Sequence, residues 1–168
     1  MDKKISERKL NKLFELNKKI VLEDDCASRV IIISECIKDI LKVDRCTIFA
    51  YDEENNSLWS VYIDGLSYLE LPNEKGIVAQ VFQTKKSMIV DDVSRSEFFN
   101  PQVDKASGYV TRSILAVPIL GYNNRVLGVM QLINKIDGSN KFNDEDESVL
   151  AYVISHISAY LELIMQGK

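Results

Sequence analysis

The spacing of apolar residues predicts two helices at the start of the chain. Between Ile5 and Leu22 the apolar side chains recur at helical spacing, so they share one wide face of an amphipathic helix. Asp24 and Asp25 then favour the start of a second helix that ends near Leu41, because a carboxylate caps the free amides of a helix N-terminus. The dense isoleucines of this second helix are typical of a helix packed on a sheet.

After Leu41 the apolar pattern changes to a period of two, which predicts strands. The last two strands are almost continuously apolar, so we expect them to be central in the sheet. Pro118 has no amide hydrogen and implies a bulge or a locally unpaired stretch. The predicted elements are strands at 45–51, 58–63, 68–71, 87–90, 113–120 and 126–134 and helices at 77–84 and 144–165.

The segment from Asp91 to Arg112 is the longest irregular stretch, with one helical turn expected near residues 102–106. Long irregular segments in compact domains are uncommon and are often functional. Strands in consecutive antiparallel order with helices segregated to one face give an α+β domain.

The two terminal helices carry apolar stripes wider than one sheet face requires. We therefore expect residues 1–22 to be an amphipathic linker and dimerisation helix, and residues 23–168 to be the domain proper with a C-terminal signalling helix. The alternative, that both helices only complete their own core, stays open. The last helix has no strong stop signal, which favours continuation into a fused output domain.

Composition narrows the functional class. The chain has 168 residues, of which 46% are hydrophobic and 27% charged, as expected for one soluble domain. A net charge of −4 provides no broad basic field for nucleic acid. Three cysteines without metal spacing favour reduced, buried thiols. With no secretion signal and no apolar run near 18 residues, we expect a cytoplasmic protein without membrane contact.

The sequence offers little for catalysis. The single histidine, His156, lies at the border of an apolar helical stripe, and no nucleophile elbow or glycine-rich phosphate loop is found. The acidic run from Asp144 to Glu147 suits the first turn of a helix better than a metal site. We therefore expect no enzyme activity, no catalytic residue and no metal.

One motif is more specific: an Asn-Lys pair ends a strand, a phenylalanine follows, and an Asp-Glu pair opens the last helix. Its residues are Asn134, Lys135, Phe142, Asp146 and Glu147. The lysine is expected to pair with a carboxylate of the helix's first turn while the phenylalanine closes the edge between them, so the motif would be a structural latch. It resembles the signature of cyclic-nucleotide-type GAF domains, the regulatory modules of phosphodiesterases, adenylyl cyclases and many bacterial sensors.

The resemblance extends from about Asp25 to Ile164 and includes the stretches 75–78, 99–101 and 104–118. It implies a GAF fold, in which a six-stranded antiparallel sheet has helices on one face and a ligand pocket under a lid on the other. It also implies a sensory, non-enzymatic domain of a bacterial signalling protein, with cAMP or cGMP as the expected ligand. The alternative is a ligand-free module that serves only in dimerisation and interaction.

The resemblance assigns ligand contacts by position. The base would meet a first-strand hydroxyl and the end of the second strand, the phosphate and ribose would meet helix amides, and the lid would add an acid and two hydroxyls. The residue types themselves add that a flat base would lie between apolar side chains such as Phe49 and Ile63. The residues are Thr47, Phe49, Ile63, Asp64, Ile77, Val78, Asp104, Ser107, Thr111 and Gln131. Structural roles as strand residues, turn formers or caps stay open for the polar members.

The same assignment predicts a preference among nucleotides. A linear 5′-nucleotide carries more phosphate charge than a cyclic one, and this charge would meet Asp64 and Asp104. No basic side chain is singled out nearby, so linear nucleotides are expected to bind less well.

Overall fold

The computed structural model describes residues 5–166 as one α+β domain with a six-stranded antiparallel sheet. Residues 1–4 and 167–168, at the ends of the predicted segments 1–22 and 23–168, lie outside the described residues. The strand order is β3-β2-β1-β6-β5-β4. This corrects the expected consecutive order, because the long strands β1 and β6 pair with each other in the middle of the sheet. In chain order the elements are α1 (Glu7–Leu22), α2 (Cys26–Leu41), β1 (Val43–Asp52), β2 (Ser57–Ile63), β3 (Glu70–Pro72), α3 (Ile77–Thr84), β4 (Met88–Val90), η1 (Val93–Arg95), α4 (Gln102–Ser107), β5 (Ile114–Leu120), η2 (Tyr122–Asn124), β6 (Val126–Lys135) and α5 (Asp144–Gln166).

Local signals explain most of these bounds. Ser6 caps α1 and Asp25 caps α2, each by accepting a hydrogen bond from a backbone amide of the first turn. Lys42 ends α2 in the left-handed region. Two expectations are corrected: β1 begins at Val43, earlier than predicted, and β3 includes Pro72, where an edge position needs no ladder hydrogen bond from proline.

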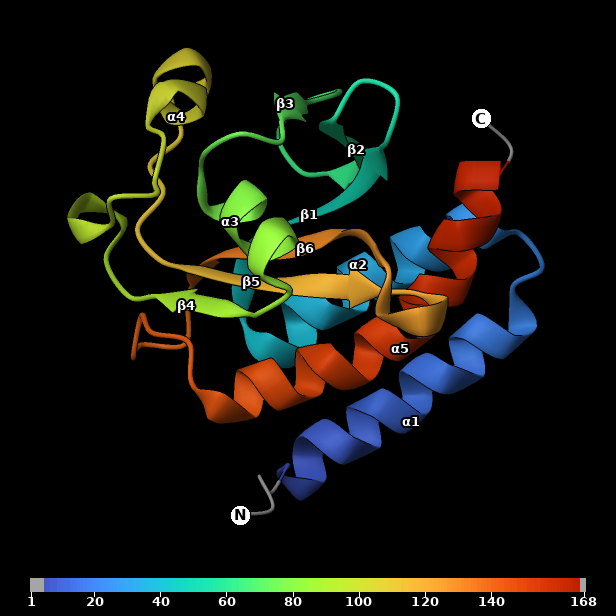
Figure 1. Ribbon diagram of the computed structural model, residues 1–168. Helices are drawn as coiled ribbons and strands as arrows, with labels where there is room; N and C mark the ends of the chain where they lie inside the picture. The colour runs from blue at the N-terminus through green and yellow to red at the C-terminus, as the bar shows by residue number, and fades with distance from the viewer. Residues whose placement is uncertain (1–4, 167–168) are drawn as a thin grey trace.

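The sheet separates two apolar cores. Figure 1 shows α1, α2 and α5 on one side of the sheet and α3 and α4 on the other. On β1, Cys46, Ile48 and Ala50 face the first core, which α2 and α5 complete, while Phe49 belongs to the second core with residues of α3. Because β5 and β6 are covered on both faces, their sequences are almost continuously apolar.

Helix α1 forms an outer layer. Its buried residues Leu13, Leu16 and Ile20 join the first core, and the helix packs against α2. In Figure 1 it runs along the outside of α2 and α5. The buried part of the apolar surface of α1 therefore packs on other helices instead of directly on the sheet, and Leu10, Phe14 and Val21 stay exposed.

The irregularity expected at Pro118 is displaced by one residue. Pro118 pairs with Val129 of β6, and the register shift falls between Ile119 and Leu120. Strand β4 pairs with β5 only from Ile114 to Ala116, so it does not reach the proline. A residue without an amide hydrogen is tolerated at such a position.

Helix α5 is long and apolar enough to cross a membrane when only its length and composition are considered. In the described structure Val149, Leu150, Val153, Ile157 and Leu161 are instead buried in the first core. A core helix of a globular domain meets the same criterion, because a core helix and a membrane-spanning helix both need a wide apolar surface.

A close approach of β1 and β6 yields the first testable prediction. Gly128 lies opposite Ala50, and an ideal Cβ built on Gly128 overlaps the carbonyl oxygen of Phe49. Since that oxygen is a backbone atom, it cannot rotate away, and Gly128→Ala is expected to lower the free energy of unfolding by about 3 kcal/mol. Urea denaturation would measure the loss.

Gly138→Ala is the matched control. A Cβ at Gly138 meets nothing within 4 Å, but its φ of +93° costs a non-glycine residue about 1 kcal/mol. Equal losses in the two variants would contradict the steric explanation.

Candidate functional site

A cavity of about 220 Å³ lies between the second face of the sheet, helix α3 and the segment around α4. All ten residues expected to contact a ligand line this one cavity, although they come from separate elements. They are Thr47, Phe49, Ile63, Asp64, Ile77, Val78, Asp104, Ser107, Thr111 and Gln131. None of the five motif residues between Asn134 and Glu147 is among its lining residues.

Strand register builds the floor of the cavity. Thr47 of β1 is the register partner of Ile63 on β2 and of Gln131 on β6. Three neighbouring strands therefore place these side chains in a row. Within residues 5–166, neither the Thr47 hydroxyl nor the Gln131 amide has a hydrogen-bond partner, although Thr47 is only 5% exposed. Such groups are available to a ligand.

The start of α3 forms one end of the cavity. Gly76 precedes the helix with a φ of +111°, a conformation that favours glycine, and no side chain caps the helix there. The amides of Ile77 and Val78 belong to the first turn, where they have no partner within the helix. An uncapped N-terminus carries partial positive charge and suits an anion.

Residues 104–113, several of which line the cavity, form the segment called the lid, and its polar side chains are bonded within and next to this segment. The carboxylate of Asp104 accepts hydrogen bonds from the amide of Thr111 at 2.6 Å and from its hydroxyl at 2.7 Å. The hydroxyl of Ser107 donates to the carbonyl of Val103 at 2.9 Å. These are the turn and cap roles that the sequence left open, and a ligand would have to exchange partners with them.

Asp64 is also occupied by protein groups. Its Oδ2 accepts from the amide of Cys46 at 2.9 Å and lies 2.9 Å from Nζ of Lys38, while Oδ1 accepts from the Tyr62 hydroxyl at 2.8 Å. Burial, together with hydrogen bonds to carboxylates, raises the pKa of Tyr62. The Asp64 side chain therefore anchors the end of β2 to α2.

Two cations on the cavity wall were missed by the sequence reasoning. Arg45 and Lys75 both line the cavity, so the statement that no basic side chain lies near Asp64 and Asp104 is wrong. Arg45 could have been found from its position two residues before Thr47, since alternate residues of a strand share a face. The reason for expecting linear nucleotides to bind less well, a lack of positive charge near their extra phosphate charge, therefore no longer holds.

The Arg45 side chain is stacked on the lid. Its guanidinium carbon lies 3.7 Å from the ring centroid of Tyr109, and the Tyr109 hydroxyl donates to Asp44 at 2.5 Å. Burial and the Asp44 carboxylate raise the pKa of Tyr109 to about 12. The phenol therefore stays protonated and continues to donate at neutral pH.

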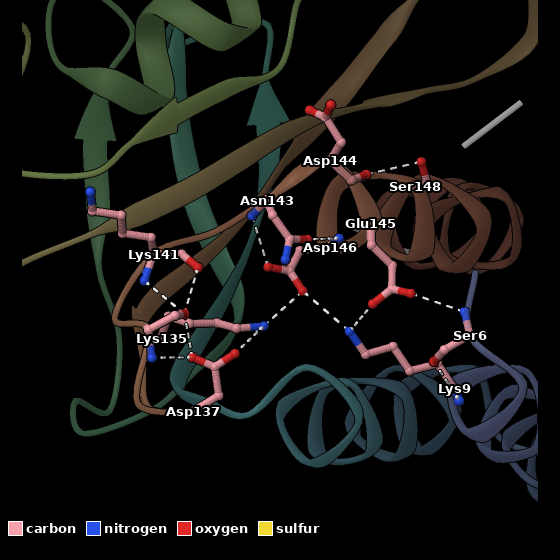
Figure 2. Close-up of polar contacts among 11 residues, drawn as sticks. Ser6, Lys9, Lys135, Asp137, Lys141, Asn143, Asp144, Glu145, Asp146 and Ser148 are labelled. Carbon is pink, nitrogen blue, oxygen red and sulfur yellow. Dashed lines mark hydrogen bonds and ion pairs between the residues drawn. The ribbon is translucent and has the colours of Figure 1, made fainter. Parts of the chain in front are cut away.

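Outside the cavity, the Asn-Lys motif forms a buried ion pair (Figure 2). Nζ of Lys135 lies 2.7 Å from Oδ1 of Asp146, and the two side chains are 2% and 0% exposed. The Asn143 amide donates to Oδ2 of Asp146 at 3.0 Å, and the Asp146 amide donates to the Asn143 side chain at 2.9 Å. This reciprocal cap fixes the start of α5.

Phe142 and Glu147 lie beside this pair. The ring of Phe142 is buried, with its centroid 5.9 Å from Nζ of Lys135. The hydroxyl of Ser87 donates to Glu147 at 3.4 Å. Both residues thus pack around the start of α5, away from the cavity.

The same cluster reaches α1. Lys9 forms an ion pair with Glu145 and lies 3.7 Å from Asp146, and the Ser6 amide donates to Glu145 at 2.9 Å. Figure 2 shows these contacts joining the starts of α1 and α5. The hydrogen bond from Lys9 is the main cause that lowers the pKa of Glu145.

Asn134 ties the lid to β6. It has a φ of +65°, and its Oδ1 accepts from the amides of Arg112 at 2.7 Å and Ser113 at 3.2 Å. Its Nδ2 donates to the Val110 carbonyl and to the Tyr109 hydroxyl, each at 2.9 Å. One side chain therefore holds the whole return of the lid segment.

The thiols and the imidazole lie elsewhere. Cys46 is buried on the helix side of β1, where burial raises the pKa of its thiol. Cys26 and Cys36 are only half-buried, which corrects the expectation of buried thiols at these two positions. His156 is half-buried beside Tyr152, at a ring separation of 5.4 Å. None of these four lines the cavity as far as the described residues define it.

Comparison with known proteins gives consistent results. The family model described as GAF domain matches residues 30–161. The cone cGMP-specific 3′,5′-cyclic phosphodiesterase subunit alpha′ of Bos taurus is 33% identical over 142 residues, which are 76% of this chain and 16% of that protein's length.

Two solved structures are similar in fold. The GAF domain from an Acinetobacter phosphoenolpyruvate-protein phosphotransferase has a TM-score of 0.81 at 23% identity, covering 96% of this chain and 98% of that one. The free methionine-R-sulfoxide reductase from Neisseria meningitidis, solved in complex with its substrate, has a TM-score of 0.77 at 16% identity, covering 98% and 96%. At these identities the likeness concerns the fold alone.

The buried ion pair generates a second prediction. Lys135→Ala leaves the carboxylate of Asp146 buried without its main partner, so the free energy of unfolding is expected to fall by about 3 to 5 kcal/mol. Lys12→Ala, which removes one of two lysine partners of the exposed Asp39, is the control and should cost less than about 1 kcal/mol. Similar losses in both variants, measured by urea denaturation, would show that the Lys135 pair has no special role.

Proposed function

The chain belongs to the GAF domain family, and on this premise we propose that it is a regulatory domain that binds a cyclic nucleotide, cAMP or cGMP. The observation that carries the proposal is the convergence of ten separately assigned positions on one cavity. A concave site with apolar walls and a few polar groups is typical of small-ligand binding.

The cavity offers a distinct environment to each part of such a ligand. The uncapped start of α3 suits the phosphate. Phe49 and Ile63 supply apolar surface for a flat base, and Thr47 and Gln131 supply unpaired polar groups. The related phosphodiesterase is named for a 3′,5′-cyclic nucleotide, but this chain spans only 16% of its length, so its catalytic activity is not transferred.

We assign the domain a regulatory role instead of a catalytic one. A structural neighbour with the same fold is an enzyme that acts on methionine sulfoxide. In this chain the cysteines and the histidine lie away from the cavity as described, so a thiol or imidazole is not placed against a bound ligand.

A ligand-free interaction module is the second candidate. It is favoured by the hydrogen bonds within the lid, where Asp104 is bonded to Thr111 and Ser107 to Val103. It is also favoured by the cavity volume of about 220 Å³, which is below the roughly 300–1,000 Å³ of ordinary ligand pockets. For the first candidate, the same facts mean that the lid opens when a ligand enters.

In the proposed mechanism, lid movement reaches the terminal helices, which act on an output domain of a cytoplasmic bacterial signalling protein. Asn134 holds the lid and the adjacent Lys135 holds the start of α5. Lys9 extends the connection to α1. A change at the lid would therefore be transmitted through contacts that already exist.

The third prediction tests ligand binding. cAMP or cGMP at a hundredfold excess over its dissociation constant should add about 2.7 kcal/mol of stability. For a chain of this size that is a rise in melting temperature of several degrees, at roughly 2 to 4 °C per kcal/mol. Thr47→Val should keep the melting temperature of the free protein and reduce the rise, because the lost hydroxyl has no protein partner.

Thr84→Val serves as the control, since the Thr84 hydroxyl donates to Gln80 outside the cavity. Mass spectrometry should first establish that the purified protein carries no ligand. If neither nucleotide at millimolar concentration then shifts the melting temperature, the interaction module becomes the better assignment.

The fourth prediction concerns dimerisation through the terminal helices. On α1, Leu10, Phe14 and Val21 share one helical stripe and are 38%, 60% and 76% exposed. We expect sedimentation to show a dimer at micromolar concentration, and Phe14→Glu to shift it toward monomer by placing a charge on that stripe. Glu15→Lys, on another exposed face of α1, should leave the dimer intact. A monomeric parent protein would rule out this interface.

A further inference from the structure

The side chain of Arg45 occupies one end of the cavity with its donors free. Its guanidinium is stacked on Tyr109 and rests against Gly65, where an ideal Cβ would overlap it. Within residues 5–166 the guanidinium has neither an ion pair nor a hydrogen-bond partner. A glycine at position 65 therefore leaves the space that this side chain fills.

The carboxylates beside Arg45 are already engaged. Asp44 accepts from the Tyr109 hydroxyl, and Asp64 is held by Lys38 and by the Cys46 amide. Neither one neutralises the guanidinium directly. An unpaired, half-buried fork of N–H donors on a cavity wall is best explained by a partner that enters the cavity.

The two ends of the cavity differ in chemistry. Helix α3 packs on β5 and β6, whereas Arg45 lies on β1 and adjoins Gly65, which follows β2. The α3 end presents backbone amides that suit a phosphate. The Arg45 end, beside Thr47 and Ile63, is left for the planar part of the ligand.

A guanidinium donates five hydrogen bonds and accepts none, and stacking on an aromatic ring fixes its plane. Its edge therefore matches a planar group that presents two acceptors side by side. Guanine presents such a pair in N7 and O6, whereas adenine presents N7 next to the N6 donor.

We propose that Arg45 determines the base preference of this cavity and selects a 6-oxopurine cyclic nucleotide, cGMP, over cAMP. This inference rests on the proposed nucleotide-binding function. It adds Arg45 to the ten assigned positions and states which of the two cyclic nucleotides the cavity prefers.

The test compares dissociation constants of cGMP and cAMP by isothermal titration calorimetry at fixed ionic strength. The parent protein should prefer cGMP by roughly ten- to a hundredfold, the usual discrimination of a two-bond contact. Inosine 3′,5′-cyclic monophosphate keeps N7 and O6 without the 2-amino group, so it should bind nearly as well as cGMP.

Arg45→Gln should abolish or invert the preference, because an amide offers one donor and one acceptor, the pair that matches adenine. Arg45→Lys keeps the charge but loses the planar fork, so it should reduce the preference for cGMP without favouring cAMP. Lys75→Gln, the matched control, removes a positive charge from the same wall and should weaken both nucleotides by a similar factor. Thermal melting would establish that each variant is folded. If Arg45→Gln does not fold, the ratio of the two dissociation constants in Arg45→Lys tests the role of Arg45 instead.

The outcomes separate the two proposals. An equal loss of both nucleotides in Arg45→Gln, an unchanged ratio, or a parent protein that prefers cAMP would overturn the role of Arg45 while leaving nucleotide binding in place. A parent protein that binds neither nucleotide would overturn the proposed function, and this inference with it.

Discussion

The arrangement of the domain depends on one buried ion pair, between Lys135 and Asp146. A carboxylate with no exposed surface is tolerated only when its oxygens are fully bonded, and those of Asp146 meet Lys135 and the Asn143 amide, with Lys9 close by. The end of β6, the start of α5 and the start of α1 therefore converge on a single charge. The acidic first turn of α5 supplies that charge and also suits the helix dipole.

Asn134, the residue before Lys135, connects this ion pair to the other side of the sheet. Along β6, Gln131 and Ile133 line the cavity while Met130 and Leu132 lie in the first core. The left-handed φ of +65° at Asn134 interrupts this alternation, so that Asn134 reaches the cavity side and Lys135 the helix side. Asn134 binds the lid segment from Tyr109 to Ser113, and Lys135 binds the helix layer. The structure thus provides a short covalent connection between the cavity side and the terminal helices, with hydrogen bonds at both ends.

The cavity itself has a fixed floor and a self-contained lid. Strand register holds Thr47 and Gln131 in place, and their side-chain polar groups have no hydrogen-bond partner among residues 5–166. The lid satisfies its own polar groups through Asp104 and Thr111. In the proposed function, the floor and the uncapped start of α3 would contact the ligand, and the hydrogen bonds within the lid would have to open to admit it.

Sequence patterns alone predicted the α+β class, the order of helices and strands, and the latch motif, because periodicity reports which face of an element is buried and capping residues mark helix starts. The resemblance placed nine residues, residue type added Phe49, and all ten line one cavity. Tertiary structure decided which polar groups pair: Asp64 with Lys38, Asp104 with Thr111, and Lys9 with the latch. It also left the Arg45 guanidinium at the cavity wall without an ion pair or hydrogen bond in the described part of the chain. These partners are far apart in the sequence or lie on different elements, and a periodic pattern carries no information about which side chain will meet which once the layers pack.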